Sequence, residues 1–264
     1  MVRRKIKEIP DPQRRRDYRG ISIDIVGVKG LRYPITVLDR ERGQQNTVGT
    51  FNLYVNLPHR FKGTHMSRFI EILNKYHGSI SIMKITEILD SMKKYLQAKE
   101  AHIEVSFPYF IRKVAPVSKA ESFMCYRCII HGISKSKPKE ILTVEVPVTT
   151  LCPCSKEISE NGAHNQRSLV TVSVQFKKMV WIEDIVKLVE ESASCEIYPL
   201  LKREDEKYVT EKAYSKPMFV EDVIRTIARK LQADPKITWY RVDSENFESI
   251  HSHNVYACLE KSKI

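Results

Sequence analysis

The chain has 264 residues, of which 42% are hydrophobic and 29% are charged, and its formal net charge is +12. This balance is typical of a soluble globular protein and excludes a disordered or fibrous chain. No apolar run approaches the ~20 residues of a membrane-spanning helix, and the basic N-terminus lacks the apolar segment of a secretory signal. We therefore expect a cytoplasmic protein without a membrane partner, whose six cysteines are reduced.

After a basic arm over residues 1–20, the first half of the chain shows two hydrophobic periods. Apolar residues at every second position predict strands, and apolar residues three or four apart predict helices. The expected strands are 21–26, 32–38, 47–57, 102–110 and 122–130, with Gly27 and Gly30 ending the first. The expected helices are 66–76 and 82–96. A polar turn at 135–139 then follows.

The second half repeats this order of elements, although not the residues themselves. The expected strands are 140–148, 169–176, 237–242 and 254–259, and the expected helices are 181–189 and 220–231, with a polar connection at 202–216. The repeat predicts an α+β protein with two modules, 21–135 and 136–264, each a four-stranded antiparallel sheet with two helices on one face. Because unpaired edge strands are a liability, we expect copies to pair edge to edge and close β-barrels.

The segment 152–168 is the strongest candidate for chemistry. It is predicted to be a loop between two strands, with Cys152 and Cys154 leaving the first strand and His164 preceding the second. A thiolate beside an imidazole suits a borderline-soft divalent metal, whereas the ordinary interpretation of the two cysteines is burial as small hydrophobic residues. Glu206 lies in a charged run that would otherwise be solvated, and it could complete a three-ligand site with an open catalytic position.

The other four cysteines are not expected to join this site. Cys125 and Cys128 lie in one predicted strand, where alternation points their thiols to opposite faces, which argues against a structural zinc site. Cys195 and Cys258 lie in apolar runs and are expected in the core.

Three further residues are candidates for substrate and proton chemistry. Glu221 begins a predicted helix, where it either interacts with the helix dipole or binds the N–H groups of a planar heterocycle. Glu248 and His251 lie three residues apart between the last two strands and suit an acid–base pair.

These residues stand in motifs that together resemble the type IB GTP cyclohydrolases of folate synthesis. The motifs are 51–58, 61–69, 147–156, 162–168, 219–222 and 245–254, and the resemblance covers nearly the whole chain after about residue 10. The resemblance implies a tunnelling fold of tandem modules in a homotetramer with active sites between subunits. It implies the conversion of GTP and water to 7,8-dihydroneopterin triphosphate and formate.

The same resemblance implies roles for single residues. By motif, the ligands of one manganese, iron or zinc ion are Cys152, His164 and Glu206. Glu221 is implied to anchor the guanine, and Glu248 and His251 to lie beside the metal's water, with His251 moving protons. Candidates for cations that meet the triphosphate are Lys62, His65, Arg68 and Arg167.

Three alternatives remain open at this point. The related nitrile reductases of queuosine synthesis use a nucleophilic cysteine and a nicotinamide cofactor without a metal. A second variant of the cyclohydrolase stops at a cyclic phosphate product. The third alternative is a nucleic-acid-binding protein, which the net charge and the run Arg14–Arg16 would suit, but no nucleic-acid-binding motif accompanies them and we expect no nucleic acid partner.

Overall fold

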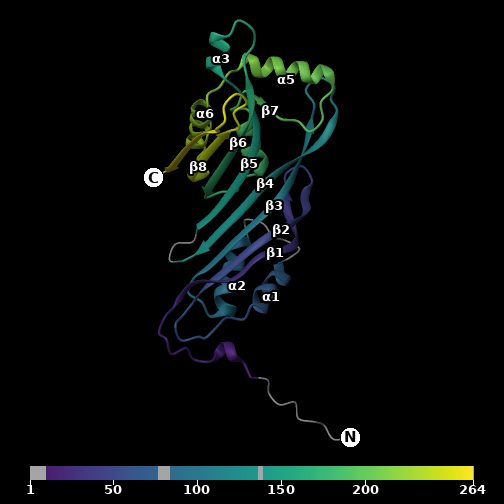
Figure 1. Ribbon diagram of the computed structural model, residues 1–264. Helices are drawn as coiled ribbons and strands as arrows, with labels where there is room; N and C mark the ends of the chain where they lie inside the picture. Colours follow the sequence, from purple (N-terminus) through teal and green to yellow (C-terminus); the bar gives the residue numbers. More distant parts are fainter. Residues whose placement is uncertain (1–9, 77–83, 136–138, 264) are drawn as a thin grey trace.

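A computed structural model of the chain describes residues 10–76, 84–135 and 139–263 (Figure 1). The strands are β1 Ile23–Asp39, β2 Gly43–Leu57, β3 Ala101–Val114, β4 Glu121–Ser134, β5 Lys139–Leu151, β6 Asn165–Phe176, β7 Cys195–Glu196, β8 Ile237–Asn246 and β9 Val255–Ser262. The helices are α1 Ser67–Tyr76, α2 Ile85–Leu96, α3 Pro153–Ile158, α4 Ile182–Glu190, α5 Arg203–Ser215 and α6 Val220–Ala233, after a short 3-10 turn Pro12–Arg14. Among the residues described, no helix has the length and hydrophobicity needed to cross a membrane.

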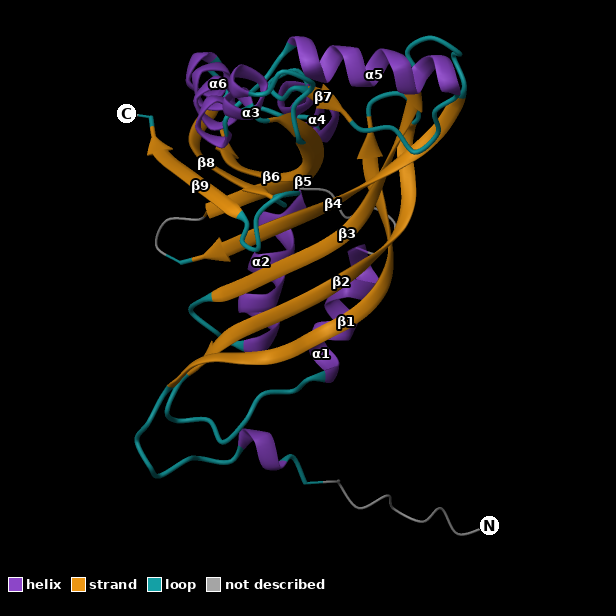
Figure 2. Cartoon of the chain, turned by 45° about the horizontal axis from the view of Figure 1, so that its top comes forward, coloured by secondary structure: helices purple, strands orange, loops and turns teal. Residues whose placement is uncertain are grey.

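One antiparallel sheet runs through the whole described chain. Its strand order is β1-β2-β3-β4-β5-β6-β8-β9, and the two-residue β7 pairs with β5 beside this path. The two halves join where β4 pairs with β5, from Arg127 opposite Glu145 to Ile133 opposite Lys139. The sheet is strongly twisted and curved (Figure 2). The expected α+β class with antiparallel strands is therefore confirmed.

Helices from both halves cover the same face of this sheet. On β4, alternate residues point inward, and two of them contact helices from different halves. Tyr126 donates a hydrogen bond to Glu190 of α4, with 2.8 Å between the two oxygens. Gly132 lies against Ile85 of α2. One continuous apolar core, with Phe51, Ile88, Val144, Val189 and Ile227 among its members, results from this shared face.

The first strand is longer than the sequence pattern predicted. Gly27 and Gly30 do not end it, because β1 continues past both and changes register with β2 between Ile23 and Val26 and between Val28 and Leu31. A side chain at position 27 would lie 1.9 Å from the Leu53 carbonyl oxygen. Gly30 has a φ of +72°. The two glycines therefore permit a close approach and a bulge within one strand.

Residues Arg203–Ser215 of the segment 202–216, which we expected to be a polar connection, form a helix. Helix α5 has three acidic residues in its first turn, Glu204, Asp205 and Glu206, and such residues stabilise a helix N-terminus. Its two buried residues are Asp205 and Ala213. The helix was missed because it has no apolar stripe, and apolar spacing is the main sequence signal for helices.

Other expectations near the second half also need correction. The predicted loop after β5 contains the short helix α3. Cys258 was expected in the core but is exposed on β9. Cys195 is buried, as predicted. Cys125 is exposed and Cys128 is buried, which agrees with the prediction that their thiols point to opposite faces of the strand. Residues 1–9 of the arm, Ile82 of the second helix and most of the predicted turn at 135–139 lie outside the described residues.

The contact between Gly132 and α2 yields a stability prediction. A Cβ atom at Gly132 would lie 2.3 Å from Ile85 Cγ2 and 2.9 Å from Ile103 Cγ2. Gly132→Ala is therefore expected to lower the free energy of unfolding by about 1–3 kcal/mol through overpacking. Gly63→Ala is the matched control, because its Cβ would come no closer than 3.4 Å to the side chain of Gln13. Equal stability of the two variants in urea unfolding would contradict the prediction.

Candidate active site

Cys152 and His164 lie side by side at the base of the α3 segment. The backbone N–H of Cys152 donates to the carbonyl of His164 at 3.1 Å. Cys152 caps α3, and its Sγ accepts a hydrogen bond from the Ser155 amide at 3.4 Å. The Ser155 hydroxyl, in turn, accepts a hydrogen bond from the His164 amide at 3.2 Å. This closed loop holds the half-buried thiol and imidazole at one end of the sheet.

A chain of hydrogen-bonded polar side chains holds the His164 ring through its Nδ1 atom. Its Nδ1 lies 3.0 Å from Gln166 Oε1, and Gln166 Nε2 donates to Thr150 Oγ1 at 2.9 Å. Thr150 continues the row to Ser168, with 2.8 Å between their hydroxyl oxygens. An Nδ1–H group that donates to Gln166 leaves the Nε2 lone pair free, which is the form that a metal-binding imidazole takes. The Cys152–His164 pair therefore fits a divalent metal.

Two further predicted elements reach the same end of the sheet. The Ser249 hydroxyl lies 3.3 Å from His164 Nδ1, which brings the loop with Glu248 and His251 against the imidazole. In that loop the rings of His251 and His253 stack with their centroids 5.2 Å apart. The Met218 amide donates to the Leu151 carbonyl at 3.0 Å and places the start of α6, where Glu221 lies exposed, beside the end of β5.

Glu206 does not meet this pair within one copy of the chain. It lies in the first turn of α5, whereas the link from α5 to α3 is made near the other end of the helix, where Lys156 Nζ donates to the Tyr214 carbonyl at 2.6 Å. Glu206 and Tyr214 are eight positions apart in this helix, or ~12 Å along its axis. Within the described ranges, no three His, Cys, Asp or Glu side chains of one copy could hold a metal ion.

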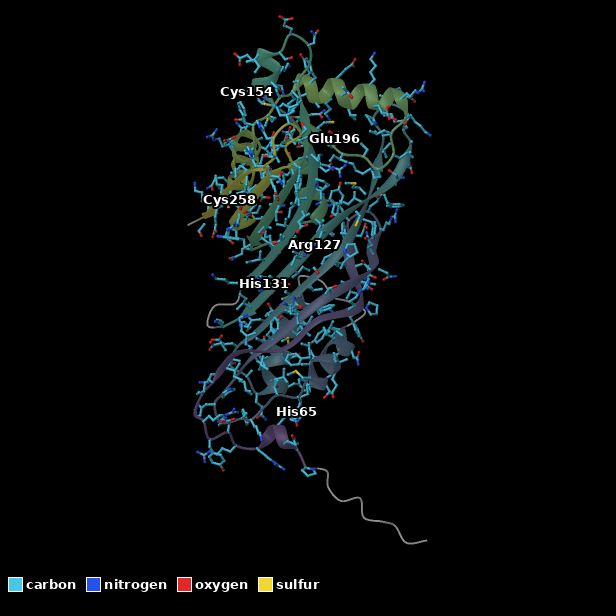
Figure 3. The ribbon with its side chains drawn as sticks, in the orientation of Figure 1. His65, Arg127, His131, Cys154, Glu196 and Cys258 are labelled. Carbon is cyan, nitrogen blue, oxygen red and sulfur yellow. The ribbon has the colours of Figure 1, made fainter. Side chains whose placement is uncertain are left out.

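His65, one of the candidate cations of the 61–69 motif, lies at the opposite end of the molecule from Cys154 (Figure 3). His65 Nε2 lies 3.0 Å from an Asp11 carboxylate oxygen. Arg68 donates to the Tyr95 carbonyl at 2.7 Å. The topology explains this separation, because β2 and β5 run in opposite directions and the loops that follow them leave opposite ends of the sheet.

The fourth candidate cation, Arg167, lies beside Gln166, the hydrogen-bond partner of His164, instead. It lines a cavity of about 300 Å³ together with Gln166 and Glu196. Glu196 accepts hydrogen bonds at 2.6 Å from both Tyr198 and Lys212. Burial would raise the pKa of Glu196, but these two hydrogen bonds outweigh it and lower the pKa from 4.5 to about 2. The carboxylate is therefore ionised beneath α5 at neutral pH.

Sequence reasoning missed several residues that support the candidate site. Thr150 and Ser168 are fully buried and Gln166 is nearly so, at positions where strand alternation would place apolar side chains. The sequence could have indicated these residues, because they are polar at inward strand positions next to a candidate ligand, and buried polar groups require hydrogen-bond partners. Ser249 carried no such signal.

Comparison with known protein families identifies relatives over nearly the whole chain. A family model described as type I GTP cyclohydrolase folE2 matches residues 9–257. The chain is similar to proteins named GTP cyclohydrolase FolE2 from Syntrophotalea carbinolica, with 57% identity over 250 residues, and from Syntrophus aciditrophicus, with 58% identity over 252 residues. Both alignments cover 95% of this chain, and they cover 94% and 99% of the relatives.

Comparison with solved structures supports the fold alone. Uricase from Arthrobacter globiformis has a TM-score of 0.52 at 8% identity, covering 91% of this chain and 93% of that one. The R298C mutant of the urate oxidase from Bacillus sp. TB-90 also has a TM-score of 0.52, at 10% identity, covering 91% and 99%. These values indicate a shared arrangement of strands and helices and carry no argument about the reaction.

The polar cluster beneath α5 predicts a pH-dependent stability. Glu196→Gln is expected to lower the free energy of unfolding by about 1–2 kcal/mol at pH 7, because Lys212 loses its charged partner. A lowered carboxyl pKa contributes stability that is present above pH 4.5 and lost as the pH falls toward about 2. The difference between Glu196→Gln and wild type should therefore shrink below pH 4.5 in denaturant titrations.

The matched control is Glu211→Gln on α5, the helix that contains Lys212; its partner Lys207 is largely exposed. Exposed pairs of this kind contribute little, so this variant should unfold like wild type at every pH. If the difference in free energy of unfolding between Glu196→Gln and wild type is constant from pH 7 to pH 3, the charge of Glu196 is not what stabilises the protein.

Proposed function

The chain belongs to the type I GTP cyclohydrolase family named FolE2, and from this premise we propose that it works at a divalent metal held between copies of the chain. Its activity is that of a GTP cyclohydrolase in folate biosynthesis, which converts GTP and water to 7,8-dihydroneopterin triphosphate and formate. The observation that carries the activity is the 57–58% identity to curated relatives over 95% of the chain. No observation favours the reductase or nucleic-acid alternatives.

The proposed metal ligands are Cys152 and His164 of one copy and Glu206 of another. The first two are adjacent, and the imidazole has its Nδ1 engaged by Gln166 at 3.0 Å. Glu206 is exposed at the far end of α5, where a second copy could reach it. A thiolate, an imidazole and a carboxylate accept several first-row metals, so manganese, iron or zinc could fill the site.

The remaining chemistry is assigned to the other side chains of this end of the sheet. A bound metal would lower the pKa of water and supply hydroxide near neutral pH for attack at C8 of the guanine. Glu248 and His251, held near His164 by Ser249, would orient the water. His251 would donate and accept the protons of ring opening and formate release. Glu221 would accept the N–H groups of the guanine edge.

The triphosphate would be bound by cations from more than one copy. Arg167 lies beside Gln166 at the end with Cys152 and His164. His65, with Arg68 beside it, lies at the opposite end of the same chain, and Lys62 is in the same loop. A substrate that touches both sets must therefore lie between copies. Because the polar contacts of His65 and Arg68 already hold Asp11 and the Tyr95 carbonyl, binding would exchange these partners for phosphate oxygens.

A tunnelling fold with closed barrels is the assembly that we propose for these copies. The modules would be 21–135 and 136–264 behind an arm of residues 1–20, and a homotetramer would pair β1 with β9 edges. Exposed apolar side chains on these edges, Ile25 and Tyr256, support such pairing. The uncovered sheet face carries polar pairs such as Asn52–Glu104 and Thr143–Ser173, which suit a water-filled interior.

Metal removal tests the reaction class. Chelator-treated protein is expected to release no formate from GTP, and Mn²⁺, Fe²⁺ or Zn²⁺ should restore release together with a neopterin-type product. Mass spectrometry of that product separates the linear triphosphate from a cyclic phosphate. Cys152→Ala should abolish turnover with any metal, whereas Cys154→Ala, whose side chain is exposed, should retain it. Full activity of Cys152→Ala would refute the ligand assignment.

Mixing two inactive variants tests whether the site lies between copies. Cys152→Ala and Glu206→Gln should each be inactive alone. If the three ligands come from two copies, unfolding and refolding the variants together in equal amounts should restore about a quarter of wild-type turnover, because random assembly leaves that share of sites intact. Wild-type protein refolded alone sets the reference. No recovery in mixtures shown to be mixed oligomers would place all three ligands in one copy.

A further inference from the structure

Helix α5 presents Glu206 without an apolar face to hold it on the protein. Surface helices are normally positioned by an apolar stripe, whereas the buried residues of α5 are Asp205 and Ala213. Toward its C-terminal end, α5 is held on the protein by polar contacts and not by apolar packing; there Lys212 Nζ donates to Glu196 at 2.6 Å. The first turn, which contains Glu206, lies away from this contact and requires its own anchor.

Asp205 supplies that anchor. Its side chain is fully buried, with 0% exposure. Oδ1 accepts hydrogen bonds from the backbone amides of Val117 at 2.8 Å and Ser118 at 2.9 Å. Oδ2 accepts from the Ser118 hydroxyl at 2.5 Å and from the Lys202 amide at 2.8 Å. Four donors thus converge on one carboxylate, and three of them come from the turn between β3 and β4.

This turn is a firm base for the helix. The Ala115 amide donates to the Ala120 carbonyl at 2.9 Å and closes the turn, and Lys119 completes it with a φ of +61°. Both flanking strands pair along their whole length, from Ala101 opposite Ser134 to Val114 opposite Glu121. Through Asp205, the first turn of α5 is therefore joined directly to the central sheet.

We propose that Asp205 is a positioning residue for Glu206, because it holds the first turn of α5 on the β3–β4 turn and so sets where the Glu206 carboxylate meets the metal. The inference rests on the proposed function, since it requires Glu206 to be a ligand. The Glu206 amide donates to the Lys202 carbonyl at 2.9 Å, and Asp205 accepts from the Lys202 amide, so both residues share one rigid turn. Only a carboxylate can accept all four hydrogen bonds. In an asparagine, one of the two oxygens is replaced by an NH₂ group, which would face two of the donors and could not accept from them.

Metal affinity tests this role separately from turnover and from folding. The full-length Asp205→Asn variant is expected to bind Mn²⁺ at least ~10-fold more weakly than wild type in equilibrium dialysis, as loss of a ligand's supporting partner does at other metal sites. Ser118→Ala removes one donor from the opposite side and should weaken binding in the same direction by less. Glu204→Gln, an exposed neighbour in the same turn, is the matched control and should bind like wild type.

The outcomes separate this inference from the proposed function. Glu206→Gln should lose Mn²⁺ binding; if it does not, the ligand assignment itself fails. If Glu206→Gln loses binding while Asp205→Asn and Ser118→Ala bind normally, the positioning role alone is wrong. A lowered melting temperature of the metal-free variants with unchanged Mn²⁺ affinity would likewise reduce Asp205 to a structural residue. Should Asp205→Asn fail to fold, Ser118→Ala decides the question.

Discussion

The pairing of β4 with β5 is the interaction on which the rest of the structure depends. It joins two groups of strands into one antiparallel sheet and gives helices from both halves a single face to cover. The core is therefore continuous, and Tyr126 and Gly132 of one strand contact helices from different halves. A chain of 264 residues thereby buries its apolar surface on one side of the sheet and keeps polar pairs on the other.

The same antiparallel order decides where the chemical groups lie. Because β2 and β5 run in opposite directions, the loop with His65 and the loop with Cys152 are at opposite ends of the sheet. Glu206 lies in the first turn of α5, whereas the α3 segment after Cys152 contacts α5 near its other end, at Tyr214. The functional groups that the motifs name therefore lie apart in a single copy, and this separation is the reason for our proposal that the site forms between copies.

Polar contacts, and not apolar packing, arrange the surroundings of the candidate site. The row from His164 through Gln166 to Thr150 fixes the imidazole, and Asp205 fixes the first turn of α5. Buried hydrogen bonds of this kind are directional, so they specify the orientation of a ring or a helix more narrowly than apolar contact does. A catalytic group held this way keeps its geometry while the nearby surface remains open to substrate.

The sequence by itself determined the α+β class, most strands, four of the six helices in the described residues, and the family, because hydrophobic period and motif spacing are local properties. It also identified Cys152 and His164 as a pair, since a strand-loop-strand segment must return its ends to neighbouring positions. Only the tertiary structure decided that Gly27 permits a close approach to β2, that Gly30 lies at a bulge, that residues 203–215 are helical and that Asp205 is buried. These features depend on partners far away in the chain, such as the Leu53 carbonyl and the Ser118 turn, which no local pattern records.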